Sequence, residues 1–351
     1  MVSRNLNKII KLIEKIYKFT KPRYIIPKDS FSKKNFGIIN RLEEIDPKSD
    51  REKLINQLIN IYGIQVEYPL KIKDKTKGIK TNQAKIKNNG ILYEKSSFIS
   101  YDGLEIPTYI IYPPNFESNK KYPTIIIFSG HGSAKQAAFE ENSYQHGAGI
   151  ALSKKGFLVY VMENRGMGDL SYLGNHLRID AVARIIGGTW YGEILTDALW
   201  LIENLHHHSY VDMNCIGTAG VSTGGAMSLI VTALNNNISA AYIQGYLGSF
   251  KKTFGIRANH CLCGHIPGIL KICDMSDIAS LIAPRPLMFV NGTADIFYYI
   301  DAKEEFRKII PSYKKLGSEE KLKLKIPEGI GHEFSTDIAI NWFTKQFGIS
   351  Y

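Results

Sequence analysis

This sequence contains few cysteines and no long uninterrupted run of apolar residues. The 351 residues include four cysteines, at 215, 261, 263 and 273, which are too few and too bunched for a disulfide framework and indicate a reducing compartment. No window approaches the roughly 18 uninterrupted apolar residues of a membrane span. Residues 1–21 carry a lysine every three or four positions and lack the apolar stretch of a signal peptide. We therefore expect a soluble, cytoplasmic protein.

Acidic residues are scarce only in the first quarter of the chain. Residues 1–90 contain 21 Lys and Arg against 9 Asp and Glu, whereas residues 91–351 contain 23 against 24. The net charge of +11 therefore belongs to the leading segment, and we expect no specific nucleic-acid partner for the balanced remainder. The shift predicts a basic N-terminal extension, residues 1–90, followed by a main domain, residues 91–351.

The extension shows helical patterning. Residues 4–19 place apolar side chains at helical spacing with lysines toward the other face, and residues 51–62 form a second candidate helix. Residues 71–90 are typical of an exposed linker or of an excursion into the first strand. A basic amphipathic helix can dock on a membrane surface or a partner, but we favour the interpretation in which its apolar stripe packs on the main domain.

From residue 91 onward, strands alternate with helices. Apolar residues make up 44% of the chain, enough for a core of ordinary size. Runs that are apolar on both faces, such as residues 124–128, are typical of a parallel sheet covered by helices on both sides. We predict an α/β architecture whose sheet starts with an antiparallel meander. The predicted strands are 92–99, 105–112, 123–129, 157–162, 214–219, 239–244, 286–291 and 321–326, and the predicted helices are 142–155, 192–206, 224–235, 301–316 and 335–347.

A glycine-rich turn, Gly220-Val221-Ser222-Thr223-Gly224-Gly225, lies between a predicted strand and a predicted helix. This is the context of a nucleophile elbow, in which a serine sits on a tight turn and the glycines leave room for neighbouring backbone. The alternative is a glycine-rich helix start that binds phosphate through its N–H groups. The placement between strand and helix favours Ser222 as a nucleophile.

A serine nucleophile needs a histidine base held by a carboxylate, in the chain order serine, acid, histidine. Asp295 lies just past the predicted strand 286–291, and His332 lies on a glycine-flanked loop after the last predicted strand. Each could instead be an ordinary loop residue, and Asp301 is the nearest rival acid. Because the placements agree, we predict a triad of Ser222, His332 and Asp295.

Ester chemistry also needs donors for the developing oxyanion. One should be the backbone N–H of Thr223, the residue after the nucleophile. The other should come from Gly130-His131-Gly132-Ser133, after the strand 123–129, where the N–H groups of His131, Gly132 and Ser133 remain alternatives. We interpret the His131 side chain as a support for this loop.

The segment His260-Cys261-Leu262-Cys263-Gly264-His265 offers two thiols and two imidazoles, which are plausible zinc ligands. It lacks the usual C-x₂-C spacing, however, and a serine triad needs no metal. We therefore interpret His260, Cys261 and Cys263 as lining of the substrate pocket, and we predict no metal and no cofactor.

These motifs carry a family resemblance over residues 91–351. The motifs are Gly130-His131-Gly132, Glu163-Asn164-Arg165-Gly166-Met167-Gly168, Gly220-x-Ser222-x-Gly224-Gly225, Ala283-Pro284-Arg285-Pro286-Leu287 with Gly292-Thr293-Ala294-Asp295, and Gly331-His332. Together they resemble α/β-hydrolases of the dienelactone-hydrolase and acetyl-xylan-esterase-like branch. The resemblance implies cofactor-free hydrolysis of a small-molecule ester through an acyl-enzyme, and we place Arg165 in the substrate pocket. Dienelactone hydrolases use cysteine where this chain has Ser222, and residues 1–90 have no counterpart.

Other functions use the same residues. A peptidase or amidase related to prolyl oligopeptidases, a thioesterase and an acyltransferase would all carry this triad, although the leader is too short for the propeller of prolyl oligopeptidases. A non-catalytic module that docks through its basic segment is the alternative of another class. The sequence leaves the acyl group, the alcohol and the oligomeric state open.

Overall fold

The computed structural model describes residues 51–66, 85–88, 90–257 and 260–349. The predicted helix 4–19 and most of the predicted linker 71–90 lie outside these residues. All of the described residues belong to one compact unit.

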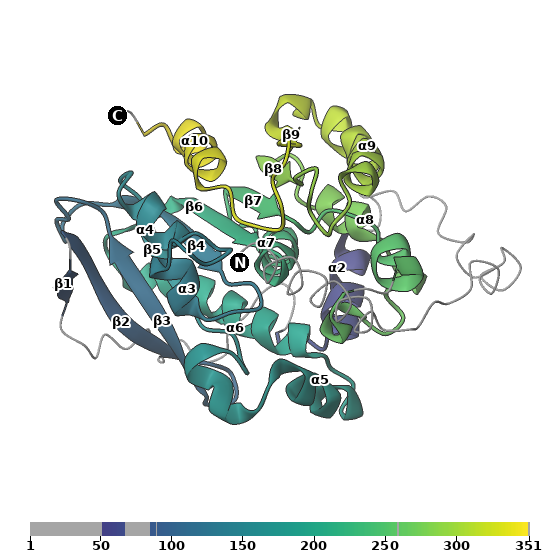
Figure 1. The fold of residues 1–351 in the computed structure, drawn as a ribbon, viewed down its shortest axis with the longest axis horizontal. Coiled ribbons are helices and arrows are strands. Elements are labelled where there is room, and N and C mark those ends of the chain that lie inside the picture. The colour runs from purple at the N-terminus through teal and green to yellow at the C-terminus, as the bar shows by residue number, and fades with distance from the viewer. Residues whose placement is uncertain (1–50, 67–84, 89, 258–259, 350–351) are drawn as a thin grey trace, which may run out of the picture. The chain divides into compact units, whose positions relative to one another are not determined.

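The described residues form a nine-stranded sheet with the order β1-β2-β3-β5-β4-β6-β7-β8-β9 (Figure 1). The pairs β1–β2, β2–β3 and β3–β5 are antiparallel, and the pairs from β5–β4 to β8–β9 are parallel. The predicted meander and mostly parallel sheet are therefore confirmed. The strands are β1 (Ile86–Asn88), β2 (Ile91–Ile99), β3 (Glu105–Tyr112), β4 (Tyr122–Phe128), β5 (Leu158–Met162), β6 (Val211–Val221), β7 (Ala240–Gln244), β8 (Leu287–Val290) and β9 (Leu322–Lys325).

Helices cover both faces of the sheet, because successive side chains of each buried strand point to opposite sides. On β4, Ile125 and Ile127 join the core under α3, α4 and α10, while Ile126 and Phe128 join the larger core under α2, α6, α7 and α8. The helices are α2 (Arg51–Tyr62), α3 (Ala134–Phe139), α4 (Ala148–Ser153), α5 (His176–Ile185), α6 (Trp190–Asn204), α7 (Thr223–Leu234), α8 (Met275–Ser280), α9 (Tyr299–Lys315) and α10 (Thr336–Phe347). Within these described parts, no helix has the length and apolar character to cross a membrane.

Helix α2 belongs to the core even though the charge pattern assigned it to the extension. Its apolar face is buried, and the Tyr62 carbonyl at its end accepts a hydrogen bond of 2.8 Å from the Thr189 hydroxyl at the start of α6. A Cβ on Gly192 would lie 1.9 Å from the same carbonyl oxygen. The Tyr62 ring also contacts Tyr191, with centroids 6.4 Å apart. This helix of the predicted extension therefore packs on the main domain.

Candidate active site

Ser222 lies on the turn between β6 and α7. Its backbone has φ 62° and ψ −127°, a strained combination that projects a side chain out of such a turn. The turn has no room for larger neighbours, because a Cβ on Gly220 would lie 2.3 Å from the Gly224 carbonyl carbon and one on Gly224 would lie 1.9 Å from the Phe128 oxygen. The Ser222 N–H donates to the Gln244 carbonyl on β7 (3.1 Å) and ties the turn to the sheet. The glycine pattern thus has a steric cause.

His332 and Asp295 meet at the carboxyl ends of the next strands. Nδ1 of His332 lies 2.8 Å from Oδ1 of Asp295, and the same oxygen accepts the Phe297 N–H at 2.9 Å. Asp295 is buried. The rival carboxylate, Asp301, instead pairs with Arg257. The structure therefore brings Asp295, and not Asp301, to the imidazole.

The loop that carries His332 is anchored on both sides. The Phe334 N–H donates to the Tyr144 carbonyl (2.8 Å), and the Ser335 N–H donates to Oε1 of Gln244 (2.7 Å). Nε2 of Gln244 donates in return to the Ser335 hydroxyl (2.9 Å). Gln244 thereby joins the Ser222 turn to the His332 loop. Direct hydrogen bonding between Ser222 and His332 is absent among the described residues.

A cavity of about 140 Å³ opens at Ser222. This volume is close to the roughly 150 Å³ of an apolar cavity that holds one benzene molecule. His332 stacks on Phe297, a residue of the cavity wall, with ring centroids 6.0 Å apart. The lining consists of His131, Tyr191, Ser222, Thr223, Tyr246, Phe254, His260, Cys261, Cys263, Gly264, Ile296 and Phe297. The space suits a small group.

The loop after β4 has most of its N–H groups already engaged. The N–H of Gly132 donates to the Gly130 carbonyl (2.9 Å), and that of Ser133 donates to Oε1 of Gln136 (3.2 Å). Of the three residues left open by the sequence, His131 alone keeps a backbone N–H without a carbonyl or carboxamide acceptor in the described structure, and His131 lines the cavity.

Two further hydrogen-bond donors, the Thr223 N–H and the Tyr144 hydroxyl, accompany the His131 N–H. The N–H of Thr223, in the first turn of α7, also has no acceptor within the described chain, as is usual at a helix start. The Tyr144 hydroxyl is buried with no side-chain hydrogen-bond partner in the described region, and a Cβ on Gly130 would lie 2.0 Å from it. Burial raises the pKa of Tyr144, whereas its backbone contact with His131 lowers it. Sequence reasoning missed Tyr144, which no local motif marks.

Arg165 does not line this cavity but a second hollow, together with Asp102 and Glu193, and its place in the substrate pocket stays a prediction. Its guanidinium binds the fully buried Asp197 (Nε to Oδ2, 2.7 Å) and Asp102 (Nη1 to Oδ2, 2.6 Å). Burial opposes its charge, but the hydrogen bonds and charge of Asp197 raise the pKa of Arg165 above its usual value. Its carbonyl accepts the Trp190 indole N–H at 2.8 Å. Arg165 therefore stabilises the fold by linking Asp102, Trp190 and Asp197.

The predicted pocket residues His260, Cys261 and Cys263 do line the cavity. Burial, followed by the nearby His332, lowers the pKa of His260 to about 4. His265, which the sequence offered as a second imidazole ligand, instead faces the Cys261 carbonyl (Nδ1, 3.2 Å) and the Phe254 carbonyl (Nε2, 2.9 Å).

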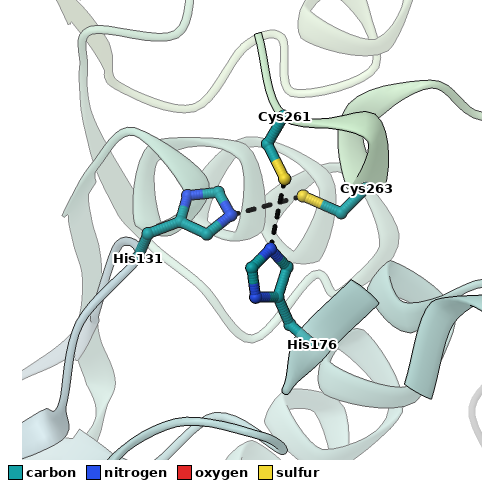
Figure 2. A group of neighbouring side chains, drawn as sticks. All are labelled: His131, His176, Cys261 and Cys263. Carbon is teal, nitrogen blue, oxygen red and sulfur yellow. Dashed lines mark hydrogen bonds between the residues drawn. The ribbon is translucent and has the colours of Figure 1, made fainter. Parts of the chain in front are cut away.

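The two thiols lie instead beside two distant histidines (Figure 2). Nε2 of His131 is 3.3 Å from Sγ of Cys263, and Nε2 of His176 is 3.1 Å from Sγ of Cys261. The hydrogen bond between the thiols lowers the pKa of Cys261 and raises that of Cys263. Sequence reasoning missed His176, the first residue of α5. Asn175, which caps that helix, was the available signal.

Solved structures that superpose on this chain include esterases and peptidases. A putative acetyl xylan esterase from Bacteroides fragilis superposes with a TM-score of 0.70 at 16% identity, covering 86% of this chain and 89% of that one. A glucuronoyl esterase from Solibacter usitatus superposes with a TM-score of 0.64 at 12% identity, covering 87% and 94%. The comparison confirms the predicted α/β-hydrolase fold.

Sequence relatives place the chain more finely. Dipeptidyl-peptidase 5 of Porphyromonas gingivalis is 26% identical over 44% of this chain, which spans only 21% of that protein's length. A putative hydrolase of Bacillus subtilis is 25% identical over 54% of this chain and 65% of its own length. The family model described as acetyl xylan esterase (AXE1) matches residues 82–274, more than half of the sequence and the part that holds Ser222. By that match, together with the fold and the serine turn, the chain belongs to the acetyl xylan esterase family.

Proposed function

We propose that the protein removes a small acyl group, acetyl first of all, from a hydroxyl of a carbohydrate. One observation carries the proposal: the strained Ser222 turn opens into the 140 Å³ cavity whose wall His332 and Asp295 support. The names of the family and of its structural neighbours support a carbohydrate ester.

The chemistry follows from the placement of each group. Ser222 Oγ attacks the ester carbonyl while Nε2 of His332 takes its proton, and Asp295 holds Nδ1–H so that Nε2 is free to do so. The imidazolium then protonates the leaving alkoxide and an acyl-enzyme remains. A water molecule, deprotonated by His332, attacks the acyl-enzyme, releases the carboxylic acid and restores Ser222.

The oxyanion of each tetrahedral intermediate accepts hydrogen bonds from the N–H groups of Thr223 and His131. The Thr223 N–H has no acceptor among the described residues, and the His131 N–H contacts only the Tyr144 hydroxyl, so neither donor has to leave a backbone partner before it binds the charge. The N–H groups of Gly132 and Ser133, the other predicted donors, already donate hydrogen bonds within the protein, so we do not assign them to the oxyanion. The buried Tyr144 hydroxyl, which contacts the His131 backbone, is the third donor beside this pair.

The size of the cavity sets the acyl specificity. A volume of 140 Å³ is close to that of an apolar cavity of roughly 150 Å³ that holds one benzene molecule, which has six carbon atoms. Acetyl and propionyl groups fit, whereas an octanoyl chain does not. Hydrolysis of p-nitrophenyl acetate, butyrate and octanoate should therefore fall steeply in kcat/KM along the series, and acetate should be released from acetylated xylo-oligosaccharides.

The variant Ser222→Ala and the exposed control Ser209→Ala complete this assay. Ser222→Ala should lose roughly 10⁴-fold or more in kcat, because the triad acts as a unit, and Ser209→Ala should match the wild type. A preference for octanoate, or turnover by Ser222→Ala, would contradict the proposal.

A peptidase function is the second candidate, supported by the partial match to dipeptidyl-peptidase 5. Two comparisons distinguish the functions. The first sets an acetyl ester, p-nitrophenyl acetate, against the corresponding amide, p-nitroacetanilide, and the second measures the release of p-nitroaniline from dipeptidyl p-nitroanilides. Turnover of the ester alone supports the esterase proposal, and faster release of p-nitroaniline from dipeptides supports the peptidase.

A further inference from the structure

Four side chains from three separate segments converge beside the cavity. His131 comes from the loop after β4, His176 from the start of α5, and Cys261 and Cys263 from the loop before α8, and all four point toward one centre (Figure 2). Their ligand atoms lie within 4.8 Å of one another. We propose that these four residues bind one Zn²⁺ ion as a structural His₂Cys₂ site.

The geometry suits a single tetrahedral ion. With Zn–S near 2.3 Å and Zn–N near 2.0–2.1 Å, ligand atoms in a tetrahedron lie about 3.3–3.8 Å apart. The nitrogen–sulfur distances of 3.3 and 3.1 Å are already close to this range, and small side-chain rotations bring in the other pairs. A two-iron cluster would need its histidine and cysteine pairs on different metal atoms, which this compact group cannot provide.

The charges also balance. Zinc binding displaces the protons of both thiols to solvent, and the two thiolates neutralise the 2+ ion. A neutral centre can occupy a site in which Cys263 is only 1% exposed. Without a metal, the four groups make only weak thiol–imidazole hydrogen bonds, which would not require all four to face one point.

Neighbouring groups already hold the ligands in place. Nδ1 of His131 lies 3.2 Å from the Thr223 hydroxyl, so a proton on Nδ1 leaves Nε2 free to face the metal. Nη2 of Arg184 on α5 donates to the carbonyl of His265 (2.8 Å) and to that of Leu262 (3.4 Å). Arg184 thus fastens the cysteine loop to the helix that carries His176.

Four protein ligands close the site, so the ion is structural and does not activate water. It ties together the cavity wall, since His131, Cys261 and Cys263 all line the cavity. It also holds the loop whose His131 N–H faces the oxyanion. This last consequence rests on the proposed function, whereas zinc binding itself does not.

The test begins with metal content. The full chain, purified without an affinity tag or chelator under reducing, zinc-replete conditions and then desalted, should contain about one zinc per molecule by inductively coupled plasma mass spectrometry. Cys261→Ser, at the half-buried ligand, should lose most of it, and Cys215→Ser, at a half-buried cysteine on β6, should keep it. Replacement by Co²⁺ should give thiolate-to-cobalt absorption and tetrahedral d–d bands in the wild-type chain, which makes this readout independent of whether a variant folds.

Three outcomes would overturn the proposal: no bound metal after reconstitution, iron or copper in place of zinc, or zinc that survives the double change Cys261→Ser and Cys263→Ser. The variant Ser222→Ala separates the two proposals, because it should lose esterase activity and keep its zinc. A wild-type chain that binds zinc through these residues but hydrolyses no ester would refute the proposed function alone.

Discussion

Helix α2 should be indispensable to the fold, although its charge pattern resembles that of a dispensable leader. Its buried side chains are Leu54, Ile55, Leu58, Ile59 and Tyr62. Burial of each is worth about 1.5–3 kcal/mol, so removing the helix costs roughly 8–15 kcal/mol as an upper estimate. A whole domain is stable by only about 5–15 kcal/mol. A chain that starts at residue 67 should therefore not fold, whereas one that starts at Glu44 keeps every described α2 contact and serves as the reference.

A milder change gives a measurable magnitude. Leu58 is fully buried, and Leu58→Ala should lower the free energy of unfolding by about 2–5 kcal/mol. Asn56→Ala, on the exposed face of the same helix, should stay within about 0.5 kcal/mol of the wild type. Urea denaturation followed by circular dichroism measures both. Equal urea midpoints for Leu58→Ala and the wild type, or a folded and active chain from residue 67, would refute the assignment of α2 to the core.

Two further predictions concern the acid and a buried histidine. Asp295→Asn should lower kcat by roughly 10³–10⁴-fold, because the imidazole of His332 would then be held in the wrong tautomer. Asp301→Asn instead breaks the ion pair with Arg257, so kcat in the same ester assay should stay near the wild-type value. The reverse result would make Asp301 the acid of the triad. Burial, reinforced by a neighbouring imidazole, lowers the pKa of His208 from 6.5 to about 4, so the unfolded chain binds more protons between these values. The contribution of His208 to the free energy of unfolding should be fully present above pH 6.5 and should fall by about 3 kcal/mol as the pH drops to 4. In a plot of the free energy of unfolding against pH, His208→Gln should remove this fall, whereas His206→Gln, at an exposed position, should not.

Local pattern predicted the sheet because buried parallel strands are short apolar runs. Each predicted strand from 92–99 onward overlaps an observed one, and Ser222, Asp295 and His332 were found because each follows such a strand. Two six-residue helices, α3 and α8, and the ten-residue α5 escaped because they are too short or too polar to show a clear period. The predicted helix 142–155 is helical only over Ala148–Ser153.

The spacing of residues in the sequence could not predict side-chain contacts between segments that lie far apart in the chain. The motif around Cys261 and Cys263 drew attention to its own flanking histidines, but the fold supplies His131 and His176 from 130 and 85 residues earlier in the chain. Arg165 illustrates the converse, since its motif suggested a pocket residue and its guanidinium pairs with the buried Asp197 and the exposed Asp102. Partners of this kind are set by tertiary packing and leave no local trace.

Ser222 is tested as the nucleophile by reacting the 351-residue chain with a fluorophosphonate and locating the adduct by peptide mass spectrometry. We expect one stoichiometric adduct, on Ser222, formed together with complete loss of ester hydrolysis and prevented by prior incubation with a small acetyl ester. An unlabelled but folded protein, or an adduct on a different serine that abolishes activity while Ser222→Ala remains active, would contradict this expectation.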